Sequence, residues 1–135
     1  MSRDPLRLPD YLGHINEAIT RILSYFKDMD EAGFLDNAMV QDAVIRNFEI
    51  IGEASRNIER VAPQFVENHP ELPLAYAYEM RNVLAHGYYK VDLTLVWTTI
   101  ERDLPKLQTQ VAMAWRRGAT IIRTFCGHVI RLLYL

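Results

Sequence analysis

The chain has 135 residues, of which 50% are apolar and 24% are charged, and its 15 basic and 17 acidic residues leave a net charge of -2. This composition is typical of one globular domain and excludes a disordered chain, which would contain fewer apolar residues. The slightly acidic balance also excludes a general electrostatic affinity for nucleic acid. Any RNA or DNA contact therefore requires a local basic patch or a site created by pairing chains.

Three further features exclude other classes of protein. The single cysteine, Cys126, cannot form an internal disulfide, and the absence of a Cys-x-x-Cys pair excludes zinc ribbons and dithiol redox sites. Residues 1–10 lack the apolar segment of a signal peptide, and no apolar run reaches the roughly 18 residues of a membrane span. We therefore expect a cytoplasmic protein with no membrane partner.

The first expected element is an amphipathic helix over residues 10–30. Its apolar side chains recur at intervals of three and four, which is the pattern of a helix with one buried face. Asp10 is suited to the N-cap position, because a carboxylate accepts a hydrogen bond from the free N–H groups of the first turn. Gly33 closes this segment.

A second long helix is expected over residues 36–62. Its apolar residues have the same helical period, and Asp36 or Asn37 can cap its first turn. Gly52 lies inside this helix at a cost of about 1 kcal/mol relative to Ala. We interpret this glycine as a place where another helix packs closely.

Further helices are expected in the second half of the chain. A connector with three prolines, residues 63–73, precedes a helix over residues 74–86. Asp92 caps the next helix, in which Pro105 must cause either a kink or a division, because proline lacks an N–H and clashes with the preceding turn. Gly118 marks a boundary, after which a last helix and an irregular extension both fit the composition.

The expected fold class is all-α, because nothing in the chain alternates well enough to build a sheet. Long antiparallel helices with short connections indicate a four- to five-helix bundle. We assign residues 1–115 to this bundle and residues 116–135 to a C-terminal extension of unknown structure.

The segment whose side chains are best suited to catalysis lies at the end of the helix over residues 74–86. Arg81, Asn82, His86 and Tyr88 place a fixed cation, an amide, an imidazole and a phenol near one helix terminus. Arg binds phosphate as a planar bidentate donor, and His has a reference pKa of about 6.5, which suits proton transfer at neutral pH. Such groups can cleave an RNA phosphodiester without a metal, with His moving a proton and Arg stabilising the charged phosphorane.

Helix geometry constrains this hypothesis. Arg81 and His86 diverge by about 140° on a straight helix, whereas Asn82 and His86 share a face. The first two side chains converge if the long Arg wraps back or if two chains share the site, and a twofold dimer would bring two Arg and two His to one groove. The purely structural alternative is that both cations favour the negative end of the helix dipole.

The sequence resembles the HepT-like toxins of the HEPN superfamily. Residues 81–88 match that family's Arg-x4-His-x-Tyr motif. Residues 41–54 are similar to its second helix, and residues 96–107 are similar to its last helix. The combined resemblance is more specific than the short motif alone, although residues 115–135 have no counterpart in the family.

This resemblance implies a dimeric helical bundle that acts as a metal-independent ribonuclease toxin without a cofactor. It implies that Arg81 and His86 are catalytic and that Asn82 supports them by orienting the motif. It also implies an MntA-like nucleotidyltransferase antitoxin that transfers AMP to Tyr88. The adenylyl group would block the groove by its bulk and repel RNA phosphate by its charge.

Two acidic residues outside the motif have open interpretations. Glu53 follows Gly52 in an apolar helix, and a buried Glu would need a partner. Arg81 is a candidate partner, since a carboxylate can fix a guanidinium. Glu79 lies two helical turns before His86 on the same side, where it either orients the motif of a dimer partner or is a simple surface acid.

A second function class competes with the ribonuclease hypothesis. The chain can be a catalytically silent helical bundle that binds nucleotide or a nucleotidyltransferase partner, as some members of the HEPN superfamily are. The complete Arg81 and His86 pair argues against this alternative, but residue identity alone does not establish activity. Cleavage of RNA that depends on His86 separates the two classes.

Overall fold

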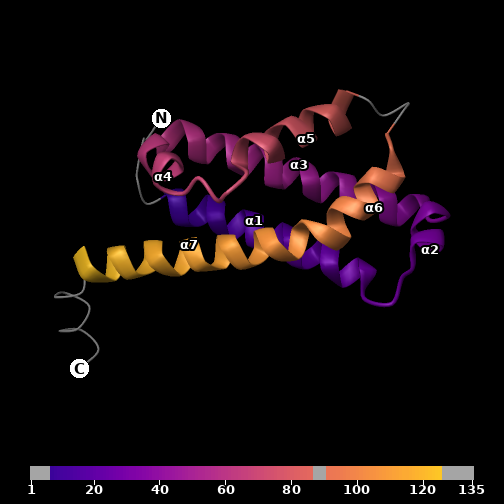
Figure 1. Ribbon diagram of the computed structural model, residues 1–135, viewed down its shortest axis with the longest axis horizontal. Coiled ribbons are helices and arrows are strands. Elements are labelled where there is room, and N and C mark those ends of the chain that lie inside the picture. Colours follow the sequence, from indigo (N-terminus) through magenta and orange to yellow (C-terminus); the bar gives the residue numbers. More distant parts are fainter. Residues whose placement is uncertain (1–6, 87–90, 126–135) are drawn as a thin grey trace.

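The computed structural model describes residues 7–86 and 91–125, which form seven helices and no strand (Figure 1). The prediction of an all-α bundle is therefore confirmed. Within the described ranges, no helix is both long enough and apolar enough to cross a membrane. In chain order the helices are α1 (Arg7–Phe26), α2 (Glu31–Leu35), α3 (Ala38–Val61), α4 (Pro63–Asn68), α5 (Leu74–His86), α6 (Leu93–Arg102) and α7 (Leu104–Phe125).

Helix α3 is the central element of the bundle. It packs against α1 on one side and α5 on the other, and α7 packs along α1 (Figure 1). Neighbouring long helices run in opposite directions, as short connections require. The core is one cluster to which every helix except α4 contributes buried side chains. On the three longest helices its buried apolar side chains keep a helical spacing: Leu12, Ile15, Ile19 and Ile22 on α1, Val44, Phe48, Ile51 and Ile58 on α3, and Val111 and Ala114 on α7.

The beginning of the chain differs from the sequence-based prediction. Helix α1 begins at Arg7, so Asp10 lies within its first turn instead of capping it. Pro9 is accommodated there because the first N–H groups of a helix have no acceptor within the helix. Gly33 does not close this segment but lies in the short helix α2, where its N–H donates to the Asp30 carboxylate at 2.7 Å.

Several other boundaries agree with the predictions. Asn37 caps α3 by accepting from the backbone N–H three residues later at 3.1 Å. Asp92 caps α6 in the same way, also at 3.1 Å. Helix α5 has the predicted range, and the proline-rich connector before it contains the short helix α4. Side-chain caps therefore determine where these helices begin.

Pro105 divides the last helical segment. Helix α6 ends at Arg102 and α7 begins at Leu104, so that Pro105 lies in the first turn of α7, where its missing N–H breaks no hydrogen bond. Helix α7 continues through Gly118, so the boundary expected there is wrong. One glycine costs only about 1 kcal/mol, which a long helix tolerates. Residues 126–135 lie outside the described residues.

Candidate functional site

The close contact between α3 and α5 depends on a missing side chain. A Cβ atom at Gly52 would lie 2.8 Å from Cγ of Arg81 and 3.0 Å from the carbonyl oxygen of Ala77, and it would also overlap Cβ of Arg81. Such distances are shorter than van der Waals contact. Gly52 therefore allows the stem of Arg81 to cross α3 directly, and the predicted close packing over this glycine is confirmed.

The guanidinium of Arg81 has two side-chain partners. Its Nη1 donates to Oδ1 of Asn82 at 2.9 Å, and its Nη2 lies 3.6 Å from Oε2 of Glu53. The side chain of Arg81 is 32% exposed, and that of Glu53 is 57% exposed. The pairing of Glu53 with Arg81 is therefore confirmed, but Glu53 is exposed and not buried.

These contacts give Arg81 a defined orientation while leaving part of it open to solvent. An exposed ion pair of this kind contributes about 1 kcal/mol or less to stability, so its main effect is on the direction of the guanidinium. The fork of donors on an Arg side chain binds a phosphate best when its plane is already oriented. Arg81 is therefore an oriented and partly exposed cation at the seam between α3 and α5.

The other motif residues are placed only in part. His86 is the last residue of α5, and the helix is continuous from Arg81 to His86. Position 86 therefore lies about 140° around the axis from position 81, as it must on a straight helix. Tyr88 lies outside the described residues. Among the sequence-predicted site residues, Arg81, Asn82 and Glu53 are brought into contact.

Glu79 lies on another side of α5. It is exposed, and helix geometry puts it roughly 160° around the axis from Arg81. Glu79 therefore does not join Arg81 within the same chain. This position is compatible with both interpretations of Glu79, as a surface acid and as a contact to a partner chain.

One residue of the seam was missed in the sequence-based reasoning. The guanidinium carbon of Arg56 lies 4.8 Å from the centroid of the Tyr78 ring, which is cation–π distance. The signal was present in the spacing, because Arg56 follows Glu53 by three residues and therefore shares its face of α3. The proximity of Tyr78 to Arg56 could not be predicted from the spacing, because it depends on how α5 packs against α3.

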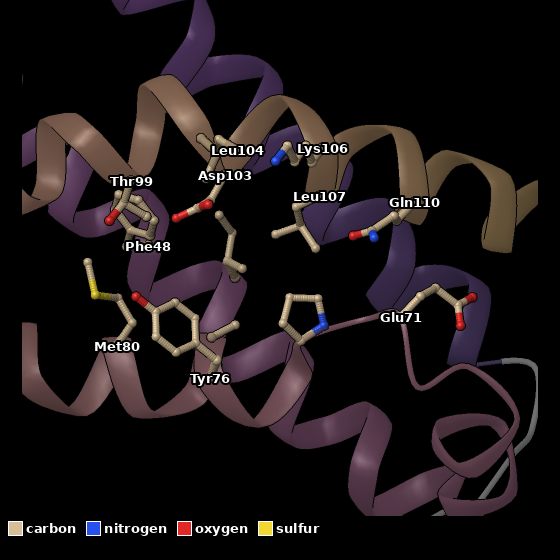
Figure 2. A pocket seen from close by; sticks show the side chains of 13 residues that line it. Phe48, Glu71, Tyr76, Met80, Thr99, Asp103, Leu104, Lys106, Leu107 and Gln110 are labelled. Atoms are coloured by element: carbon tan, nitrogen blue, oxygen red, sulfur yellow. The ribbon is translucent and has the colours of Figure 1, made fainter.

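An apolar cavity lies beside α5, where this helix faces α6 and α7. Its volume is about 380 Å³, and it opens between α5 and the junction of α6 with α7 (Figure 2). Neither Arg81 nor Asn82 lines it. Its lining is mainly apolar and includes Phe48, Ile51, Met80, Leu104 and Leu107, together with the polar side chains of Glu71, Tyr76, Asp103, Lys106 and Gln110.

Metal ligands are not gathered at either place. Within residues 7–86 and 91–125, no group of three or more His, Cys, Asp or Glu side chains is arranged to hold a metal ion. The chemistry available at the seam is therefore that of a positioned guanidinium, an amide and the exposed carboxylate of Glu53.

Comparison with known proteins places these residues in a family. The family described as "Ribonuclease HepT-like" matches residues 15–114. A Methanocaldococcus jannaschii protein named "Putative RNase" is 38% identical over 101 residues, which are 75% of this chain and 90% of that protein. "Probable ribonuclease HepT" of Thermococcus cleftensis is 41% identical over 99 residues, which are 73% of this chain and 87% of that protein.

A longer relative has a compound name. "Gamma-glutamylcyclotransferase and putative RNase" of Methanocaldococcus jannaschii is 42% identical over 101 residues, which are 75% of this chain but only 44% of that protein. The chain thus spans less than half the length of this relative. No solved structure matches the chain significantly.

Proposed function

The chain belongs to the HepT-like ribonuclease family, as the motifs indicated, and from this premise we propose that it is a metal-independent endoribonuclease toxin. In the proposed reaction a base removes the proton of the RNA 2′-hydroxyl, and the 2′-oxygen attacks the adjacent phosphorus. The bond from phosphorus to the 5′-oxygen breaks, and an acid protonates the departing oxygen. The products are a 2′,3′-cyclic phosphate and a free 5′-hydroxyl.

Arg81 has the role of stabilising the phosphorane in this proposal. The observation that carries the proposal is its placement: the guanidinium is oriented by Asn82 at 2.9 Å and by Glu53 at 3.6 Å, yet remains partly exposed. Preorganised donors stabilise charge that develops in a transition state without reorganising during the reaction. Asn82 supports this role as a positioning residue.

His86 supplies the proton transfer, and a second copy of the chain completes the site. Arg81 packs toward α3, while position 86 lies about 140° away on the same continuous helix. A twofold homodimer resolves this divergence, because the motif of one chain can then face the motif of its partner. The two imidazoles of such a groove would serve as the base and the acid.

Tyr88 is the residue through which the toxin is neutralised in this proposal. An MntA-like nucleotidyltransferase antitoxin forms a phosphodiester between AMP and the Tyr88 hydroxyl, with release of pyrophosphate from ATP. Tyr88 follows the last residue of α5 by two positions, so the added group would lie near the end of the helix that carries Arg81 and His86. Its negative charge and bulk would oppose the approach of RNA.

The test of the ribonuclease is cleavage of labelled RNA by the purified, unmodified protein in EDTA. We expect the wild type to produce 2′,3′-cyclic phosphate ends and His86→Ala to lose at least about a hundredfold in rate, as removal of a general acid or base does. His14→Ala is the matched control, because His14 is an exposed histidine on α1. Full activity of His86→Ala would refute the assignment.

The result is interpreted together with the mass of the sample. If neither protein cuts and the intact mass excludes AMP on Tyr88, the chain is the catalytically silent binding bundle. For the modification itself, transfer of labelled AMP by a purified MntA-like nucleotidyltransferase should be lost in Tyr88→Phe and retained in the neighbouring Tyr89→Phe. Label on Tyr88→Phe would show that another residue is the acceptor.

A further inference from the structure

Helix α3 presents a strip of charged side chains beside the candidate site. The members, which we call the α3 strip, are spaced by three or four residues and therefore lie within about 80° of one another around the helix. All of them are exposed except the half-buried Glu49. The strip consists of Arg46, Glu49, Glu53, Arg56 and Arg60.

The carboxylates of the strip are already paired. Arg46 lies 3.3 Å from Glu49, and Arg81 of α5 lies 3.6 Å from Glu53. Within the part of the chain that the structure describes, no carboxylate lies within 4.0 Å of Arg56 or Arg60. Together with Arg81 of α5, the three arginines and two glutamates of the strip leave a local charge of about +2, which the exposed Asp42 one turn before Arg46 lowers to about +1, on a chain whose net charge is -2.

Arg56 is held in place by an aromatic ring instead of an anion. Its guanidinium carbon lies 4.8 Å from the centroid of the half-buried Tyr78 ring. Stacking on a ring engages the face of a guanidinium and leaves its N–H edges free to donate to a phosphate. Because the side chain is already oriented, less conformational entropy is lost when an anion binds.

Arg60 extends this arrangement by one helical turn. It donates to Oδ1 of Asn57 at 2.7 Å and is exposed. It lies four positions after Arg56, which corresponds to about 6 Å along the axis of α3. Arg81 lies beside Gly52 and Glu53, one turn from Arg56 in the other direction. The cations Arg60, Arg56 and Arg81 thus follow one another along the seam.

We propose that the α3 strip and Tyr78 form the surface along which single-stranded RNA approaches Arg81, with Arg56 as its principal phosphate-binding residue. This inference rests on the proposed ribonuclease function and adds the path of the substrate. A basic track with an aromatic side chain is the arrangement that binds single strands without reading their sequence. An acidic protein surface is the competing partner, and the experiment separates the two.

The test measures binding of a labelled single-stranded RNA to the full chain at several salt concentrations, in a His86→Ala background that prevents cleavage. We expect Arg56→Gln to weaken binding about tenfold at low salt, since it removes one charge-assisted hydrogen bond to phosphate. The slope of log affinity against log salt should fall by about 0.7, the value for one lost phosphate contact on a single strand.

A second variant tests the role of the ring. Tyr78→Leu keeps every charge but removes the surface on which Arg56 lies, so we expect weaker binding with little change in the salt slope. Arg21→Gln is the matched control: it removes the same charge from an exposed position on α1, a helix that does not carry the seam, and should bind like the parent. Unchanged thermal unfolding would verify that the variants are folded.

The outcomes distinguish this inference from the function on which it rests. If RNA binds but Arg56→Gln and Arg21→Gln have the same affinity and slope, the proposed path is wrong while the ribonuclease stands. If none of the proteins binds RNA and the unsubstituted chain cuts none, the ribonuclease proposal fails and the path fails with it. Binding of an acidic protein instead, lost in Arg56→Gln, would also overturn the RNA assignment.

Discussion

The two flanks of α5 differ in how closely they pack. On the flank toward α3, Gly52 allows the backbone and the stem of Arg81 to meet without an intervening side chain. On the flank toward α6 and α7, the same helix leaves an apolar cavity of about 380 Å³ (Figure 2). The charged groups of the candidate site lie on the closely packed flank of α5, and the cavity lies on the flank toward α6 and α7.

In this bundle the cavity does not coincide with the candidate site. A catalytic group needs a fixed orientation more than it needs an enclosed volume, because misplacement of a donor by about 1 Å lowers the rate strongly. Close packing supplies that orientation at Arg81. Neither Arg81 nor Asn82 lines the cavity beside Met80 and Leu107.

Among substitutions at the two flanks of α5, the largest effect is expected from filling the closely packed flank. Gly52→Ala would force its new Cβ against Arg81 and the Ala77 carbonyl oxygen, so α5 must shift. We expect the free energy of unfolding to fall by about 1–3 kcal/mol, the usual cost of overpacking, despite the better helix propensity of alanine. The rate of RNA cleavage should fall by more than the loss of folded protein explains, because the shift displaces Arg81. Urea unfolding and the cleavage assay measure the two effects.

The matched control for this substitution is another helical glycine. A Cβ at Gly13 of α1 would lie 3.7 Å from Cζ2 of Trp115, which is ordinary contact. Gly13→Ala should therefore be neutral or stabilise the chain by up to about 1 kcal/mol. Equal stability of the Gly52 and Gly13 variants would show that the seam is not closely packed.

A smaller effect is expected on the loose flank. Leu107 of α7 is half-buried and lines the cavity, so its truncation removes fewer contacts than truncation of a core residue. We expect Leu107→Ala to lower the free energy of unfolding by about 1–2 kcal/mol and to leave RNA cleavage within twofold of the parent. Ile58→Ala, at a fully buried position of α3, should cost about 2–5 kcal/mol in the same measurement. If Leu107→Ala lowers the rate of RNA cleavage by more than its loss of folded protein explains, the cavity has a role in the function.

The smallest change in stability is expected at the ion pair of the close flank. Glu53→Gln removes an exposed charge 3.6 Å from Arg81, so the free energy of unfolding should change by less than about 1 kcal/mol. We nevertheless expect kcat to fall several-fold because the guanidinium loses its orientation, and KM to fall because a negative charge near the RNA is removed. Steady-state kinetics separates these effects.

Glu49→Gln is the control for this ion-pair prediction. Glu49 belongs to the same α3 strip but pairs with Arg46 at 3.3 Å and does not contact Arg81. It should show a lower KM with little change in kcat. If Glu53→Gln and Glu49→Gln behave alike, Glu53 contributes only its charge and does not position Arg81.

Local signals predicted most of the helices of this protein. The caps at Asn37 and Asp92 and the bounds of α5 follow from hydrogen-bonding groups near the termini and from helical periodicity. The predictions failed where such signals are weak or ambiguous. Asp10 has the chemistry of a cap but lies inside the first turn, and Gly118 interrupts propensity without ending α7.

The candidate site was predictable in its residue types but not in its contacts. The spacing of Arg81 and His86 predicts their divergence on one helix, and Gly52 indicates a close approach. The exposure of Glu53 and the position of Arg56 over Tyr78 depend on the angle and register of α5 against α3. No local pattern encodes that register, because it results from packing between segments distant in sequence.

The all-α class, the family and the order of chemical groups along α5 follow from periodicity, capping and motif spacing, which are properties of the chain. Which of those groups meet depends on how the helices pack. Packing brings Arg81 to Glu53 across Gly52 and leaves the apolar cavity where α5 faces α6 and α7. The physical reason is that side-chain contacts between helices depend on the relative placement of whole surfaces, which are fixed only when the bundle packs.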